Sequence, residues 1–247
     1  VYQTIVHETS AQRIIVPDTS MRDGLLLDFA HRVTGQEDEA MSEGAVLSAQ
    51  AIGEKYRYDE AHSRHVTALA MRFFDELRDL HGLGSRQRLL LRVAAMLHEI
   101  GGFVSSRAHH KHSYYLISNA EVFGLNRDEL EIVALVARYH RRSPPKKSHI
   151  EYMSLPREHR MVVSKLAAVL RLADALDSGH SGHVRDIRFE RHDDELVVRI
   201  PGASDLALER RDVETKNDLF EEVYGLRIRL EEAPAETETV PEPDLNL

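Results

Sequence analysis

Helical periodicity dominates the middle of this chain and limits the fold to one rich in α-helices. Between about residues 42 and 178, apolar side chains recur every three or four positions, as on the buried face of an amphipathic helix. The stretch that carries Val66, Leu69 and Phe73 is one example, and the stretch 158–178 is the longest. Several such runs separated by short polar loops predict a bundle of helices around a shared core.

Local signals indicate where these helices begin and end. Asp59 and Ser85 stand at positions where a side chain can cap a helix N-terminus, and Asn126 with Glu129 forms a capping box. Gly179 follows the last long helix, and we expect it to end that helix.

The periodicity changes after His183. The segments DIRFER and DELVVRI are rich in strand-forming residues, and the two residues between them predict a β-hairpin. A short helix, VETKNDLFEEVYG, and another strand, LRIRLEE, follow. The predicted fold class is therefore mostly α, a helical bundle followed by a small α+β domain.

Composition excludes several classes of protein. The chain of 247 residues has no cysteine, so it contains no disulfide and no thiolate chemistry. No apolar run approaches the roughly 18–20 residues that a membrane span needs, and the first residues do not resemble a signal peptide. We therefore expect a cytoplasmic protein without a membrane partner. The net charge of −9 argues against general DNA binding.

Charge is distributed unevenly along the chain. The stretch 231–247 holds six acidic residues and no basic one, and its richness in Pro, Glu and Thr predicts a disordered acidic tail. The stretch RYHRRSPPKK at 138–147 has the opposite bias, with five Lys or Arg.

Histidine and carboxylate residues interrupt the apolar faces or stand at the helix ends. The chain has fifteen histidines. Imidazole suits transition metals and carboxylates neutralise a cation, and a bundle can gather such ligands from separate helices. A bound divalent ion would clamp phosphate oxygens and lower the pKa of a water. The sequence therefore predicts a divalent metal site (Mg, Mn, Fe, Zn or Ni), whose candidate ligands are His62, His98, Glu99, His112, His140 and Asp174.

Other interpretations of these residues stay open at this point. A single histidine on an apolar face is more often a hydrogen-bonded core residue than a ligand, and Asp174 could pair with Arg171 or Arg160. A zinc-protease motif is excluded, because Gly102 stands where its second histidine would be.

The order of His62, the His98-Glu99 pair and Asp174 resembles the HD superfamily of metal-dependent phosphohydrolases. In that superfamily a histidine, a His-Asp doublet and a distant aspartate hold a divalent ion. This sequence departs from the pattern in having Glu99 at the doublet. The resemblance implies an HD-type bundle, and His112 and His140 match the extra histidines of its binuclear members.

A closer resemblance covers nearly the whole chain. The segments AAMLHEIGG, HHKHSYYLISNA, VARYHRR and LAAVLRLADALD are similar, in order and spacing, to the C-terminal half of the Ppx/GppA family of exopolyphosphatases and guanosine-pentaphosphate phosphohydrolases. The family's catalytic carboxylate and Gly-rich phosphate loops lie in its N-terminal actin-like lobes. This chain contains no such loop, so we expect either part of a longer protein or a protein without that active site.

The resemblance also suggests how the chain is divided. The opening, IIVPDTSMRDGLLLDFA, resembles the end of the second actin-like lobe. The expected domains are the end of such a lobe at 1–31, an HD-type helical domain at 32–180 with a polar linker at 31–44, a small α+β domain at 181–233 and the tail at 234–247.

The resemblance implies polyphosphate or a guanosine polyphosphate as partner, and a homodimer. A polyanion needs a row of cations, and the candidates are Arg107, Lys111, Arg141, Arg142, Lys146 and Lys147; the alternative is that RRSPPKK is a solvated loop. Three functions follow. The first is part of such a phosphohydrolase, which binds the phosphate chain and dimerises. The second is a self-sufficient metal phosphohydrolase that uses His62, His98, Glu99 and Asp174, with Glu99 and His98 as the catalytic candidates. The third is a module that binds polyphosphate or dimerises without catalysis.

Overall fold

The structure is a computed structural model. It describes residues 39–203 and 205–234, together with residues 20, 22, 24 and 26. The chain divides into two units after Asp38, and every element named below belongs to the second unit. Apart from residues 20, 22, 24 and 26, the predicted end of an actin-like lobe at 1–31 lies outside the described residues, as do the first part of the linker and the acidic tail from 235.

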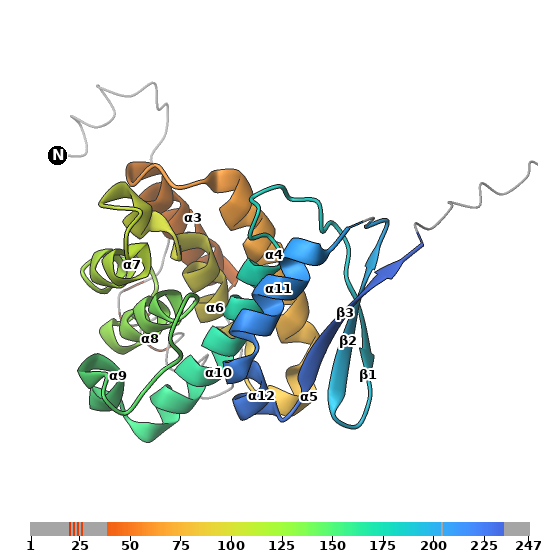
Figure 1. The fold of residues 1–247 in the computed structure, drawn as a ribbon. Helices are drawn as coiled ribbons and strands as arrows, with labels where there is room; N and C mark the ends of the chain where they lie inside the picture. The colour runs from red at the N-terminus through yellow and green to blue at the C-terminus, as the bar shows by residue number, and fades with distance from the viewer. Residues whose placement is uncertain are drawn as a thin grey trace, which may run out of the picture. The chain divides into compact units, whose positions relative to one another are not determined.

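Helices make up most of the described chain, which confirms the predicted mostly α class (Figure 1). Helix α6 packs against α3, α4 and α8, while α10 packs against α4, α6 and α8. No helix in the described part of the chain combines the length and the apolar character that a membrane crossing needs. The helices of the bundle are α3 (Glu39–Lys55), α4 (Glu60–Glu76), α5 (Arg78–His81), α6 (Ser85–Leu97), the 3-10 turn η1 (Ile100–Phe103), α7 (His109–Ser118), α8 (Arg127–Arg138), α9 (Ile150–Ser154) and α10 (Arg157–Ala175).

Two of the predicted N-caps are present. The Asp59 side chain accepts a hydrogen bond from the His62 N–H at 3.1 Å, and Asn126 and Glu129 each accept from the other's backbone N–H. The third prediction was wrong, because Ser85 is already the first residue of α6. There the Gln87 side chain accepts from the Gly84 N–H at 3.0 Å, which satisfies the helix start without a serine cap.

The ends of two helices also differ from the predictions. Helix α3 begins at Glu39, so residues 39–44 of the segment predicted as a linker are helical. Helix α10 ends at Ala175, four residues before Gly179. The reason lies in Asp177, whose carboxylate accepts from the Gly182 N–H at 2.8 Å and holds the chain in a turn there.

A three-stranded sheet near the C-terminus accompanies the bundle. Its order is β1-β2-β3, with β1 (Arg188–Arg191) antiparallel to β2 (Glu195–Pro201) and β3 (Arg227–Ala233) parallel to β2. The predicted hairpin is therefore confirmed. The crossover from β2 to β3 contains α11 (Ala207–Lys216) and α12 (Asp218–Tyr224), where the sequence predicted one helix, and both pack on α10.

Helix α10 lies between the rest of the bundle and this crossover, and its last ten residues are buried on every side. Two of the buried residues are charged, Arg171 and Asp174. The Arg171 guanidinium donates to the carbonyls of Tyr139, Arg142 and Lys216 at 3.0–3.2 Å and pairs with Asp218 at 2.8 Å. One side chain therefore joins the loop after α8 to the junction of α11 and α12.

The two glycines of HEIGG differ sharply in their surroundings. A Cβ added at Gly101 would lie 2.1 Å from the His109 carbonyl oxygen and 2.3 Å from the Ser113 nitrogen, whereas a Cβ at Gly102 would meet nothing within 4 Å. The turn η1 thus packs backbone against backbone on the first turn of α7.

We expect Gly101→Ala to lower the free energy of unfolding by about 1–3 kcal/mol, because the backbone of α7 must move to admit the methyl group. Gly102→Ala is the matched control and should cost far less. Urea denaturation of both variants measures the difference. An equal loss of stability in the two variants would contradict the close packing described for Gly101.

Candidate metal centre

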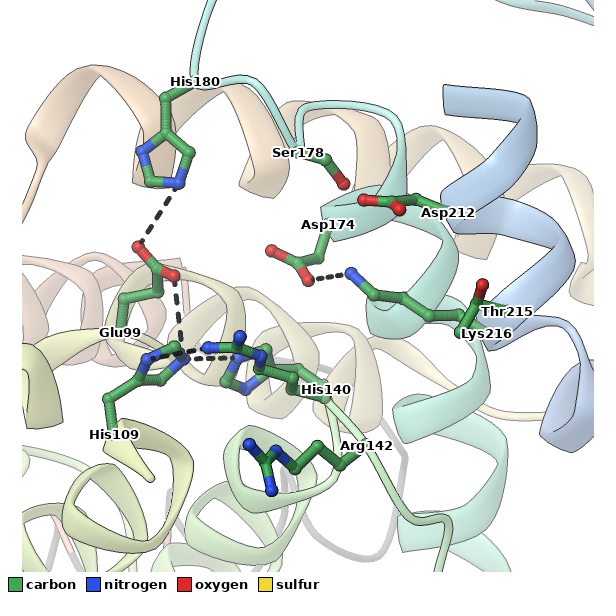
Figure 2. A pocket seen from close by; sticks show the side chains of 11 residues that line it. Glu99, His109, His140, Arg142, Asp174, Ser178, His180, Asp212, Thr215 and Lys216 are labelled. Atoms are coloured by element: carbon green, nitrogen blue, oxygen red, sulfur yellow. Dashed lines mark hydrogen bonds and ion pairs between the residues drawn. The ribbon is translucent and has the colours of Figure 1, made fainter. Parts of the chain in front are cut away.

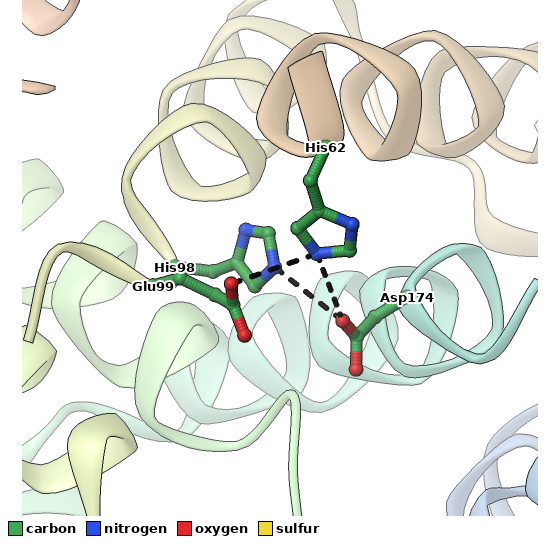
Figure 3. A group of neighbouring side chains, drawn as sticks. All are labelled: His62, His98, Glu99 and Asp174. Atoms are coloured by element: carbon green, nitrogen blue, oxygen red, sulfur yellow. Dashed lines mark ion pairs between the residues drawn. The ribbon is translucent and has the colours of Figure 1, made fainter. Parts of the chain in front are cut away.

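Four polar side chains from three separate segments converge at the ends of α6 and α10 and the start of α4 (Figure 3). One ligand atom from each of His62, His98, Glu99 and Asp174 lies within 4.8 Å of all the others. The His98 Nε2 and His62 Nε2 atoms lie 3.4 Å and 3.6 Å from Asp174 Oδ1. The His62 Nε2 to Glu99 Oε2 distance is 3.8 Å. The structure thus brings together four of the six ligand candidates in one group.

Both imidazoles of this group present Nε2 to the centre, because Nδ1 of each ring has another partner. His98 Nδ1 donates to the Ala95 carbonyl at 2.7 Å, and His62 Nδ1 donates to the buried Asp177 carboxylate at 2.8 Å. Such outer hydrogen bonds fix the ring orientation of metal-ligating histidines.

The two Nε2 atoms are buried and have no hydrogen-bond partner. The 3.4–3.6 Å that separate them from Asp174 are too long for a hydrogen bond. A buried polar atom without a partner is costly, and a cation among these atoms would remove that cost. Two imidazoles and two carboxylates are a donor set that divalent transition metals accept. The residues therefore fit a divalent metal ion.

A second group shares Glu99 with the first (Figure 2). Glu99 Oε1 lies 3.7 Å from His109 Nε2, while Oε2 faces His62. His140 Nδ1 donates to the Ala137 carbonyl at 2.5 Å, so its Nε2 accepts from His109 Nε2 at 3.1 Å. The two oxygens of one carboxylate therefore face two different ligand groups.

His109 takes the place that the sequence assigned to His112. The prediction of His112 as a ligand is not supported, because neither ligand group includes it and its Cβ lies over Gly101. Ala108 has a left-handed backbone (φ 60°) and turns the chain just before α7, so the first helical residue faces His140. The histidines at 109, 110 and 112 share one helical turn, and their spacing alone could not select one.

Sequence reasoning missed three further residues at this site. Asp177 orients His62, as described above. The His180 ring stacks on the His62 ring with centroids 3.7 Å apart. Lys216, the last residue of α11, donates to Asp174 Oδ2 at 2.6 Å. Asp177 follows Asp174 by three residues and was detectable from that spacing, whereas Lys216 had no local signal.

A pocket of about 470 Å³ opens beside the two ligand groups (Figure 2). Its walls come from the second group, the loop after α8, the turn after α10 and helix α11. Of the six cations predicted to bind phosphate, Arg141 and Arg142 line this pocket. The other four are exposed and do not belong to its lining; they are Arg107, Lys111, Lys146 and Lys147.

The charges at the site are strongly coupled. Burial alone lowers the pKa of His62, but Asp174, Asp177 and Glu99 together raise it to about 10. Burial raises the pKa of Asp174, yet Lys216 and the neighbouring imidazoles hold it well below its usual value. Burial keeps the pKa of His140 well below 6.5, so this ring is neutral. Without a metal ion, His62 and Lys216 therefore carry the positive charge that balances Asp174.

The fold and the site define a mostly helical domain with a histidine–carboxylate cluster beside a pocket that is lined by both basic and acidic side chains. A family model described as Ppx/GppA phosphatase, domain III, matches residues 46–222, which include the cluster, helix α11 and most of helix α12. The chain belongs to the Ppx/GppA phosphatase family, as the sequence motifs indicated.

Three curated relatives carry the name guanosine-5'-triphosphate,3'-diphosphate pyrophosphatase. The relative from Pseudoalteromonas translucida is 30% identical over 89 residues, which are 36% of this chain and 18% of the relative. That from Photobacterium profundum is 24% identical over 153 residues, 62% of this chain and 28% of the relative. That from Vibrio vulnificus is 24% identical over 186 residues, 73% of this chain and 35% of the relative. The match thus spans about a third or less of the length of these proteins.

The metal-free protein should lose stability as the pH rises from about 7 to 10. The pKa of His62 is raised from 6.5 to about 10 in the folded state, so in this range the folded state keeps a proton that the unfolded state releases. The stabilisation is complete below pH 6.5, and the free energy of unfolding falls by up to about 1.4 kcal/mol per pH unit above it. Urea denaturation with a chelator at several pH values measures this slope.

His62→Gln should make the free energy of unfolding depend less on pH, because the variant lacks the imidazole whose pKa is raised. His192→Gln is the control, since His192 is exposed and lies outside both ligand groups. If His62→Gln keeps the pH dependence of the wild type, a titratable group other than His62 causes it.

Proposed function

We propose that this domain III binds a divalent metal ion with His62, His98, Glu99 and Asp174, and that the adjacent pocket binds phosphate groups of a phosphoanhydride polyanion. The observation that carries the proposal is the pair of buried, unpartnered Nε2 atoms aimed at one carboxylate oxygen. A divalent ion there would polarise a phosphoryl oxygen and lower the pKa of a water.

The chain's own residues have separate tasks in this proposal. Asp177 fixes the His62 ring through Nδ1, and the Ala95 carbonyl does the same for His98. His180 covers His62 as a stacked ring. These contacts hold both ligands in place before an ion arrives, which reduces the entropy lost on binding.

The cations of the pocket supply the phosphate contacts. Arg141 and Arg142 line it from the loop after α8, and Lys216 lines it from α11. Guanidinium groups bind phosphate oxygens with two parallel hydrogen bonds, and an ammonium acts as a point charge. The names of the curated relatives favour a guanosine polyphosphate over inorganic polyphosphate as the natural partner.

One observation favours hydrolysis at this site itself as a second function. Glu99 directs Oε1 toward His109 and Oε2 toward His62, so one carboxylate can serve two cation positions. Pairs of metal ions a few ångströms apart are used by many phosphatases to clamp both the attacking and the leaving oxygen. Release of inorganic phosphate from guanosine pentaphosphate by this chain, lost in His98→Ala, would support this function over binding alone.

The purified wild-type chain should bind Mn²⁺ after treatment with a chelator and dialysis, and His98→Ala should weaken binding at least tenfold, since even outer partners of a metal ligand contribute that much. Isothermal titration calorimetry gives both affinities. His192→Ala is the control, an exposed histidine on neither ligand group. No measurable Mn²⁺ binding by the wild type would refute the proposed metal site.

The double variant Arg141→Gln/Arg142→Gln should bind pyrophosphate at least tenfold more weakly than the wild type in metal-free buffer, because charged hydrogen bonds contribute about 1.5–3 kcal/mol each. Lys146→Gln/Lys147→Gln removes the same charge outside the pocket and should change the affinity little. Equal losses in the two variants would mean that net charge, rather than the pocket, attracts the anion.

The homodimer implied by the family resemblance stays a prediction. Light scattering on the purified chain would test it independently of the metal site.

A further inference from the structure

The two oxygens of the Asp174 carboxylate have different partners. Oδ1 faces the Nε2 atoms of His62 and His98. Oδ2 accepts a hydrogen bond from Lys216 Nζ at 2.6 Å. Lys216 ends α11 in the C-terminal crossover, whereas Asp174 lies on α10 (Figure 2). A residue from outside the helical bundle therefore neutralises a candidate metal ligand.

The backbone of Lys216 is fixed while its ammonium group can move. The Lys216 carbonyl accepts from the buried Arg171 Nε at 3.1 Å, and Asp218, two residues later, pairs with the same guanidinium. The ammonium stands on four flexible methylene carbons. Its side chain also lines the pocket that holds Arg141 and Arg142. Rotation of the lysine stem can therefore carry the charge from Asp174 into the pocket without a shift of α11.

An ammonium group and a divalent ion that bind the same carboxylate repel each other. Asp174 and Lys216 are both shielded from solvent, with side-chain exposures of 10% and 15%. Two positive groups a few ångströms apart in such surroundings repel each other much more strongly than they would in water. The ammonium therefore weakens the hold of Asp174 on any cation at Oδ1 for as long as it stays on Oδ2.

We propose that Lys216 is a mobile phosphate-binding residue, which neutralises Asp174 while the metal position is empty and turns to a phosphate oxygen when a divalent ion binds. The inference rests on the proposed metal site. It assigns Lys216 two effects of opposite sign. The residue weakens the binding of a metal ion alone, and it strengthens the binding of phosphate to the metal-loaded protein. A residue that merely supports the fold would strengthen both.

The test compares Lys216→Met, which keeps the length and removes the charge, with Lys216→Arg, which keeps the charge. Lys55→Met is the control, an exposed lysine at the end of α3 outside the pocket. Calorimetry with Mn²⁺ alone, on the full chain, should show about tenfold tighter binding by Lys216→Met than by the wild type. Inorganic phosphate added to the Mn²⁺-loaded protein should bind about tenfold more weakly to the same variant. Lys216→Arg and Lys55→Met should stay close to the wild type in both titrations.

The possible results separate this inference from the proposed function. If the wild type binds Mn²⁺ and Lys216→Met binds it equally or more weakly, Lys216 does not compete with the metal and the inference is wrong. Weaker binding of both ligands together with a lower free energy of unfolding would assign Lys216 a structural role instead. If the wild type binds no Mn²⁺, the proposed metal site fails, and this inference fails with it.

Discussion

The candidate site depends on the electrostatic interactions of one buried carboxylate, that of Asp174. A charge buried in a helical core is tolerated only when hydrogen bonds and opposite charges surround it. Asp174 has two imidazoles on one oxygen and an ammonium on the other. These partners come from α4, the end of α6 and the end of α11, so side chains from three parts of the chain surround one carboxylate.

Arg171 lies one turn earlier on α10, and its guanidinium binds backbone carbonyl groups. It holds carbonyl groups on both sides of the pocket, at Arg142 and at Lys216. Helix α10 thus carries two buried charges. The anion, Asp174, contacts side chains, and the cation, Arg171, binds the backbone of the segments that contain Arg142 and Lys216. These contacts attach the C-terminal crossover to the bundle, and both segments line the pocket beside the candidate metal centre.

The ends of two helices determine which ring nitrogen of His98 and His140 faces the candidate site. His98 and His140 each follow the last residues of a helix and donate Nδ1 to the carbonyl three residues earlier. The last carbonyls of a helix have no partner within the helix, so they accept these protons and leave Nε2 facing inward. His98 is the C-cap residue of α6 and His140 follows the C-cap residue of α8, and in both cases a free carbonyl at the helix end orients the imidazole. This explains why the histidine of HEIGG stands where α6 ends.

Periodicity and capping residues in the sequence were sufficient to predict most of the helices, the hairpin and four side chains that converge at the candidate metal site. His62, His98, Glu99 and Asp174 each interrupt an apolar pattern or end it. These signals are local, because they follow from the geometry of one helix. The choice of His109 over His112 needed the left-handed turn at Ala108. The alternative that Asp174 pairs with Arg171 or Arg160 is not found, because Asp174 pairs with Lys216 while Arg171 pairs with Asp218. Only the packing of α11 and α12 on α10 decided those partners, because contacts between distant segments depend on how elements dock and leave no periodic pattern in the chain.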